Sequence, residues 1–230
     1  EVIVQNGNIV EIKPPISGRD IQLVLNTETQ NIVKESLQEG ITLANKNFDT
    51  INLIERGAVV VQKIDTGEIV SMVSLPDFDP NQFVLGISEF DFKQLNRTKA
   101  FNNFAIQGLY PPGSVFKVVA YWLALNEGIF PETALNAQDY IDCEGGLSFG
   151  FDDGSKQVYQ DWKADGHGKV NLSQAIKQSC NVYFWDIALK IWRTFGNTDS
   201  EALWQEYSKQ LGFSSVSNID LPVEKEGEVQ

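Results

Sequence analysis

The segment Tyr110-Pro111-Pro112-Gly113-Ser114 constrains the fold of this chain more than any other stretch, because it fixes where a helix can begin. Pro112 disfavours helical geometry at the residue before it, and Gly113 permits backbone conformations that other residues resist. Beyond Ser114, apolar residues recur at helical spacing, at Val115, Val118, Val119, Trp122 and Leu123. The sequence therefore predicts a turn followed by a helix that starts at Ser114 and stops at Gly128.

Ser114 and Lys117 stand three residues apart at the start of this helix, so their side chains share one face. A serine hydroxyl becomes a good nucleophile when a nearby group takes its proton, and a lysine with a lowered pKa can do this. The free amides of a helix N-terminus suit an acyl oxyanion. The alternative is a capping serine with a surface lysine, since such a chain contains about one Ser-x-x-Lys by chance.

Length and composition limit the class of protein. With 230 residues and 42% hydrophobic content, the chain can form one domain with a substantial core, with room for a small appendage. The net charge of −13 argues against nucleic acid as the main partner, because a phosphate-binding surface needs an excess of Lys and Arg. The sequence has no signal peptide and no apolar run of membrane-spanning length. Two cysteines, Cys143 and Cys180, do not identify a redox compartment.

The first half of the chain predicts a helix followed by a β-hairpin. Residues 21–25 alternate like a short strand, and residues 28–46 carry apolar residues at helical spacing, a face that we assign to the core. Residues 57–62 and 68–73 flank Asp65-Thr66-Gly67, which is typical of a hairpin turn. This order indicates an α+β fold with helices on an antiparallel sheet. Residues 75–113 lack periodicity and predict a loop over the surface.

The second half alternates irregular and helical segments. Residues 131–171 are rich in Gly and Asp and predict an irregular segment. Asn171 can cap a short helix through Ile176, and Ser179-Cys180-Asn181 then interrupts it. A second helix is expected over residues 182–195, buried on more than one side. Asp199 or Ser200 can cap a further helix.

The order of several motifs resembles a known family. Ser114-x-x-Lys117 followed by Ser179-x-Asn181 is similar to the first two motifs of the penicillin-binding proteins and serine β-lactamases. Residues 57–76 resemble the opening hairpin of the transpeptidase domain, and YPPGSVFK resembles the class B form of the first motif. Residues 161–184, DWKADGHGKVNLSQAIKQSCNVYF, are most similar to the elongation-type penicillin-binding protein 2 group. The resemblance extends over about residues 20–225, and the ordered combination is specific.

This resemblance implies a β-lactamase/transpeptidase-like α+β fold, an antiparallel sheet flanked by helices. Residues 1–20 are then expected to be a linker or the tail of a preceding module. Residues 21–230 would form the N-terminal two-thirds of the transpeptidase domain. The family's third motif, Lys-Ser/Thr-Gly, lies on a later strand, and no lysine of this chain begins such a triplet. The closing strands and last helix are therefore expected to be missing, and the chain alone is expected to be inactive.

The resemblance also implies roles for four residues. Ser114 would attack the D-alanyl-D-alanine bond of a peptidoglycan stem peptide, and Lys117 would take its proton. Ser179 would relay a proton to the leaving amine, and Asn181 would orient Lys117 and the substrate. β-Lactams would acylate the same serine, and catalysis would need no cofactor. The alternatives are a class D-like β-lactamase, with the same first two motifs, and a non-catalytic β-lactam sensor or wall-binding scaffold.

Location and partners follow from resemblance alone. A protein of this family would act on the outer face of the cytoplasmic membrane, periplasmic or extracellular, through an anchor outside this chain. Its expected partners are peptidoglycan stem peptides, β-lactam antibiotics and a membrane glycosyltransferase of the elongation machinery.

Four residues form a candidate metal set: Asp142, Asp161, His167 and Cys180. Mixed O, N and S ligands suit a tetrahedral zinc ion, and the resemblance also indicates a structural zinc at matching places. The alternatives are a locally hydrogen-bonded His167, a buried Cys180, or a disulfide between Cys143 and Cys180.

Overall fold

The computed structural model describes residues 2–6, 8–12, 16–47, 53–150 and 154–229. The chain divides into two compact units, Glu1–Ala105 and Ile106–Gln230, and each is described by itself. Among the described residues, no helix combines the length and the apolar character needed to cross a bilayer. The described residues form helices and four two-stranded antiparallel sheets, in agreement with the predicted α+β class.

The first unit begins with a small hairpin of β1 (Val2–Gln5) and β2 (Asn8–Ile12). It falls in the predicted linker, of which residues 1, 7 and 13–15 lie outside the described part; the linker assignment stays a prediction. Residues 21–25 are exposed and form no strand, so that prediction was wrong. An alternating segment without a neighbouring strand has no partner for its backbone hydrogen bonds.

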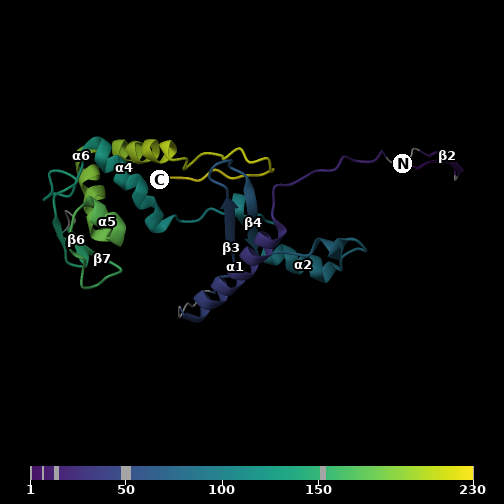
Figure 1. Ribbon diagram of the computed structural model, residues 1–230, viewed down its shortest axis with the longest axis horizontal. Helices are drawn as coiled ribbons and strands as arrows, with labels where there is room; N and C mark the ends of the chain where they lie inside the picture. Colours follow the sequence, from purple (N-terminus) through teal and green to yellow (C-terminus); the bar gives the residue numbers. More distant parts are fainter. Residues whose placement is uncertain (1, 7, 13–15, 48–52, 151–153, 230) are drawn as a thin grey trace. The chain divides into compact units, whose positions relative to one another are not determined.

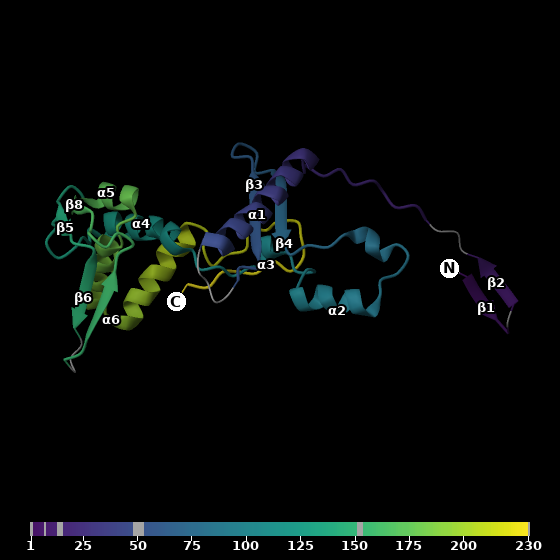
Figure 2. The same cartoon turned by 90° about the horizontal axis from the view of Figure 1, so that it is seen from below.

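A helix packed on a hairpin forms the centre of the first unit. Helix α1 (Thr27–Asn47) lies against β3 (Gly57–Gln62) and β4 (Ile69–Leu75), as Figures 1 and 2 show. Gln30 fixes the contact, because its side chain donates to the Met72 carbonyl and accepts from the Ser71 hydroxyl and the Met72 amide. The predicted helix and hairpin are confirmed, although none of the α1 residues is fully buried.

Residues 75–113 are not the single surface loop that we predicted. They contain a 3-10 turn η1 (Pro80–Phe83), helix α2 (Glu89–Thr98) and a short helix α3 (Phe104–Gln107). Helix α2 begins where the Ser88 hydroxyl accepts from the Asp91 amide, and it ends at Lys99 in the left-handed conformation. The capping serine is a local start signal for this helix, which the prediction of a loop over residues 75–113 did not take into account.

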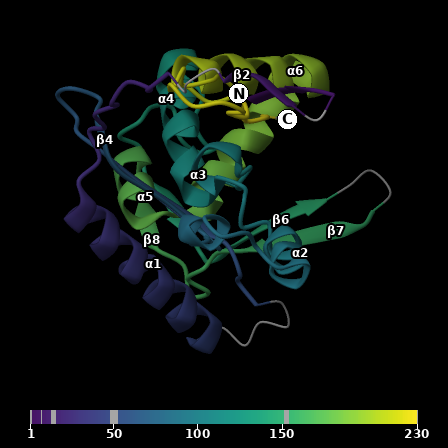
Figure 3. The same cartoon turned by 90° about the vertical axis from the view of Figure 1, so that its right-hand side faces the viewer.

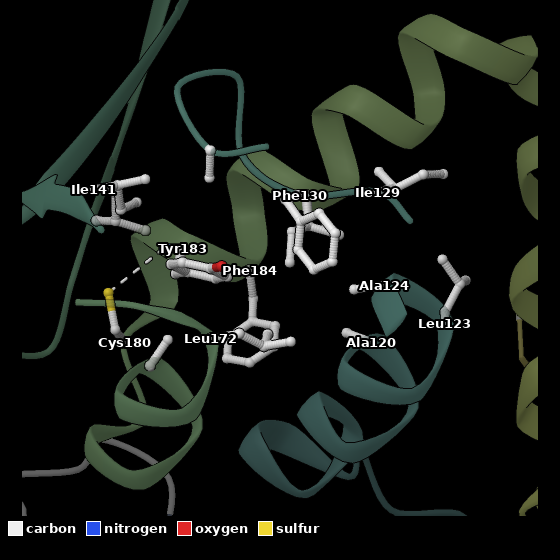
Figure 4. Packing of buried hydrophobic residues seen from close by; sticks show 14 of the residues in the cluster. Ala120, Leu123, Ala124, Ile129, Phe130, Ile141, Leu172, Cys180, Tyr183 and Phe184 are labelled. Carbon is white, nitrogen blue, oxygen red and sulfur yellow. Dashed lines mark hydrogen bonds between the residues drawn. The ribbon is translucent and has the colours of Figure 1, made fainter. Parts of the chain in front are cut away.

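The second unit is built on three helices around one hydrophobic core. A 3-10 turn η2 (Gly113–Phe116) leads into α4 (Lys117–Glu127), which Gly128 ends with a φ of 65°. Helix α5 (Leu172–Gln178) begins with a capping box between Asn171 and Gln174. Figure 4 shows residues of α4, α5 and α6 packed together in this core. These helices are confirmed close to their predicted limits.

Helix α6 (Asn181–Gln210) joins the two last helices that the sequence predicted. Its backbone breaks the helical path at Gly196, where φ is 76° and ψ is −178°. The first part is buried through Tyr183, Ile187 and Ile191, and it packs against α4. The break therefore marks the boundary that we expected between a central helix and a further one.

Within the segment 131–171, the parts that the structure describes (131–150 and 154–171) form four short strands where an irregular segment was expected. β5 (Ile141–Cys143) pairs with β8 (Gly168–Val170), and β6 (Gly146–Gly150) pairs with β7 (Lys156–Gln160). Figure 3 shows β6 and β7 side by side. The strands have three to five residues each, too few for the alternating pattern to be distinct.

Candidate active site

The nucleophile candidate Ser114 lies in the first helical turn of the second unit. The residue before it, Gly113, has a φ of 56°, a conformation that favours glycine. Ser114 is exposed, whereas Lys117, one turn later, is half-buried. The turn thus presents the hydroxyl to solvent and keeps the amine partly shielded.

A second turn, between α5 and α6, brings Ser179 and Asn181 to the same place. Ser179 ends α5 in the left-handed conformation, with φ 55° and ψ 38°, and Cys180 precedes α6. The Ser179 hydroxyl oxygen lies at hydrogen-bond distance, 3.0 Å, from Ser114 Oγ, although 65 residues separate the two serines. The structure therefore brings together the four residues Ser114, Lys117, Ser179 and Asn181, while their catalytic roles stay predictions.

The amine of Lys117 connects the two turns. Its Nζ lies 2.7 Å from the carbonyl oxygen of Ser179, 3.0 Å from the Ser179 hydroxyl and 2.5 Å from Asn181 Oδ1. Burial lowers the pKa of Lys117, and the electrostatic interactions with Asp161 and Cys180 oppose this shift only in part. A lowered pKa favours the neutral amine, which is the form that can accept a proton.

The carboxylate of Asp161 holds the Ser179–Asn181 turn in place through hydrogen bonds to its backbone. Its side chain is fully buried, and Oδ2 accepts from the backbone amide of Asn181 at 2.7 Å and from that of Val182 at 3.4 Å. Burial raises the pKa of Asp161, but the amides of Lys163 and Asn181 and the His167 ring together lower it below its usual value. The carboxylate therefore caps the N-terminus of α6, where a negative charge is favourable.

Two of the four predicted metal ligands, Asp161 and Cys180, lie close together with Cys143; His167 contacts Asp161, and Asp142 stands apart. One ligand atom from each of Cys143, Asp161 and Cys180 lies within 4.8 Å of the other two. His167 Nε2 lies 3.2 Å from Asp161 Oδ1. Asp142, in contrast, has an exposed side chain on β5 and is not part of this group.

Cys143 is the residue that sequence reasoning missed as a possible ligand. It follows Asp142 on β5, is buried, and its sulfur lies 3.1 Å from that of Cys180. Both cysteines are free. Burial raises the pKa of the Cys180 thiol to about 12, so a thiolate at this position needs a cation beside it.

The chain belongs to the family described as the penicillin binding protein transpeptidase domain, whose sequence model matches residues 57–230. Among curated relatives, it is similar to the peptidoglycan D,D-transpeptidase MrdA of Acinetobacter baumannii. The two are 34% identical over 94% of this chain and 28% of the relative. The MrdA of Salmonella typhimurium is 32% identical over 99% of this chain and 32% of the relative. The chain therefore spans about a third of the length of these relatives.

Similarity to solved structures agrees with this family assignment. Penicillin-binding protein 2 of Pseudomonas aeruginosa, in complex with WCK 5153, superposes with a TM-score of 0.64. It is 28% identical, and the match covers 94% of this chain and 42% of that one. Helicobacter pylori penicillin-binding protein 2, in complex with MreC, gives a TM-score of 0.63 at 28% identity, over 84% of this chain and 32% of that one.

Proposed function

We propose that this chain carries the nucleophile and the base of a peptidoglycan D,D-transpeptidase. One observation supports this most directly: the Ser179 hydroxyl lies 3.0 Å from both Ser114 Oγ and Lys117 Nζ. These contacts form a hydrogen-bonded chain, which runs from the hydroxyl of Ser114 through that of Ser179 to the partly buried amine of Lys117. Family membership and the D,D-transpeptidase relatives support the same reaction.

In the first step, Ser114 Oγ attacks the carbonyl carbon of a D-alanyl-D-alanine amide. The serine proton passes to Lys117 by way of the Ser179 hydroxyl, because that hydroxyl lies between the two groups. The new C–O bond forms as the C–N bond breaks, and the leaving D-alanine amine takes the proton back along the same hydrogen-bonded chain. The amine of a neighbouring stem peptide then attacks the ester, releases Ser114 and forms the cross-link.

The arrangement of donors on Lys117 suits this proton transfer. A neutral amine has two N–H groups and one lone pair. The Ser179 carbonyl and Asn181 Oδ1 accept the two N–H bonds, which leaves the lone pair for the Ser179 hydroxyl. The Ser114 amide would supply one donor to the oxyanion, and by resemblance a second would come from the strand of the third motif.

We also propose the partners and the cellular location of this protein from its family. Peptidoglycan stem peptides and β-lactams fit the family, and the Helicobacter pylori relative was solved with MreC. By analogy, the protein would work on the outer side of the cytoplasmic membrane, next to a membrane glycosyltransferase of cell elongation.

Labelling with a fluorescent penicillin tests the proposed reaction. The full-length protein should form a stable adduct whose mass maps to Ser114, and Ser114→Ala should abolish it. Ser173, an exposed serine of α5, provides the matched control, because Ser173→Ala should leave labelling unchanged. Labelling that survives Ser114→Ala would remove the nucleophile from the proposal. Rapid turnover of the adduct would indicate a β-lactamase instead.

We also propose a structural zinc ion held by Cys143, Asp161, His167 and Cys180. The donor set fits, because cysteine, histidine and carboxylate are the usual zinc ligands. If His167 Nδ1 donates to Gln178 Oε1, at 3.1 Å, then Nε2 turns its lone pair toward the Asp161 carboxylate. In that tautomer, a cation beside both atoms would stabilise the pair, whereas in the other tautomer Nε2 donates to the carboxylate. The ion would join β5 to the turn that carries Ser179 and Asn181.

Metal and thiol analysis tests the zinc site. Protein purified without chelators should contain about one zinc per chain by mass spectrometry, with two free thiols after unfolding. Cys143→Ser should lower the zinc content, whereas Asp142→Asn should leave it unchanged, because the Asp142 side chain is exposed. If the purified protein contains neither zinc nor free thiols, the result would instead support a disulfide between Cys143 and Cys180.

A further inference from the structure

Trp162 is a large aromatic residue that lies exposed beside the active site. It follows Asp161 directly, and 66% of its surface is accessible to solvent. Its ring nevertheless has a defined position, packed edge-on against His167 with centroids 5.3 Å apart. Its indole Nε1 donates a hydrogen bond to the carbonyl oxygen of Ser179 at 3.2 Å. An exposed tryptophan bound in this way calls for an explanation beyond packing.

The carbonyl that Trp162 contacts is the one that binds the base. Ser179 O accepts from Lys117 Nζ at 2.7 Å and from Trp162 Nε1 at 3.2 Å. Ser179 adopts a left-handed backbone, which is uncommon outside glycine and persists when surrounding contacts hold it. The indole N–H is one such contact, because it fixes the direction of the Ser179 peptide group.

The direction of this carbonyl decides where the lone pair of Lys117 points. In the neutral amine, one N–H directed to Ser179 O and one to Asn181 Oδ1 leave the lone pair for the Ser179 hydroxyl, whose oxygen lies 3.0 Å from Nζ. If the Ser179 peptide rotates, the amine loses one of its two fixed acceptors. Proton transfer from Ser114 then needs an extra reorientation, and small misplacements of reacting groups slow such steps strongly.

We propose that Trp162 is a positioning residue for acylation, which holds the Ser179 carbonyl and through it the amine of Lys117. The proposal rests on the acyl-transfer function proposed above. Trp162 itself contacts neither Ser114 nor Lys117 by any hydrogen bond among the described residues. It acts through one carbonyl oxygen, so removal of the N–H alone should reveal its role.

The test uses Trp162→Phe, which keeps an aromatic ring and removes the N–H donor. Rapid-mixing kinetics of the full-length protein with a chromogenic penicillin separate the dissociation constant from the first-order acylation constant. The acylation constant should fall about five- to tenfold, as expected for one lost hydrogen bond. The dissociation constant and the melting temperature should change little, which a merely structural role would not predict.

Trp122→Phe is the matched control. Trp122 on α4 also donates its indole N–H to one acceptor, Gln210 Oε1 at 3.2 Å, and is partly exposed. Its substitution should leave the acylation constant unchanged. If Trp162→Phe folds poorly, 3-benzothienylalanine at position 162 replaces the N–H by sulfur in a ring of nearly the same shape.

The outcomes separate the two proposals. An acylation constant unaffected by loss of the Trp162 N–H, or lowered equally by Trp122→Phe, would overturn the positioning role. A change confined to the dissociation constant would do the same. In each of these cases, labelling that still requires Ser114 leaves the acyl-transfer function intact; labelling of the Ser114→Ala variant removes that function itself.

Discussion

The amine nitrogen of Lys117 lies 2.5 Å from the amide oxygen of Asn181, across 64 residues of sequence. This contact joins the first turn of α4 to the first residue of α6. The two helices also pack on each other in the core of the second unit. The position of the base therefore depends on the helix packing as well as on the local motif.

Lys117→Arg should abolish most of the acylation. A guanidinium stays charged and has no lone pair to accept the serine proton, although it can still donate to Asn181 and Ser179. We expect the acylation rate to fall about 10²- to 10⁴-fold, the usual contribution of a general base. Stopped-flow acylation of the full-length protein measures this loss. Lys209→Arg, at an exposed position in the last turn of α6, should have no effect.

The acylation rate should increase with pH. Burial lowers the pKa of Lys117, and the electrostatic interactions with Asp161 and Cys180 act in the opposite direction. Only the neutral amine accepts a proton, so the rate rises as pH passes through the lowered pKa of the folded protein and then levels off. The midpoint of the profile should lie below the ordinary lysine range. A profile that is flat, or that falls as pH rises, would exclude Lys117 as the base.

Loss of the hydroxyl should destabilise the fold at one of two buried tyrosines and not at the other. Tyr207 Oη donates to Glu127 Oε1 at 2.5 Å, whereas the buried Tyr183 hydroxyl has no hydrogen-bond partner among the described residues. Tyr207→Phe should lower the free energy of unfolding by about 1–2 kcal/mol, near the low end for charged acceptors because Glu127 is exposed. Tyr183→Phe should leave it unchanged or raise it. Denaturant unfolding of both variants checks the pair.

The Tyr207 contribution also has a defined pH dependence. Burial and the adjacent Glu127 carboxylate raise the pKa of Tyr207 to about 12. A raised pKa means that the fold favours the protonated phenol. This stabilisation is therefore complete below the unfolded-state pKa of about 10, and it is lost as pH rises through about 12. The stability difference between wild type and Tyr207→Phe should shrink over that interval; a constant difference would contradict the assignment.

Local rules predicted the helices that carry the site, but not the strands beside it. The Pro-Gly turn before Ser114 and the capping box at Asn171 are signals contained in a few adjacent residues, and both helices form where those signals lie. The choice between Asp142 and Cys143 is different. Neighbouring residues of a strand point to opposite faces, so a strand of three residues has to be placed before either side chain can be assigned. The contact of Trp162 with Ser179 could not be predicted either, because Ser179 lies in a turn whose backbone direction no sequence pattern specifies.

Gly145 and Gly166 should be essential for the loop that holds Asp161. Both have positive φ, and a Cβ at Gly145 would lie 1.9 Å from the Ala164 carbonyl oxygen, while one at Gly166 would lie 2.0 Å from the Cys143 carbonyl oxygen. The Gly145 carbonyl also accepts from the Asp161 amide at 2.8 Å. Gly145→Ala should therefore cost about 2–5 kcal/mol of stability, from backbone strain together with overpacking.

Gly154→Ala separates these two effects. Gly154 has a similar φ of 84°, but no atom lies within 4 Å of the Cβ that the substitution would add. It should therefore cost only the strain, about 1–2 kcal/mol. Because the displaced loop carries Asp161, whose carboxylate binds the amide of Asn181, Gly145→Ala should also slow acylation, and Gly154→Ala should not. Equal losses of stability in the two variants would show that close approach of the backbone at Gly145 contributes nothing.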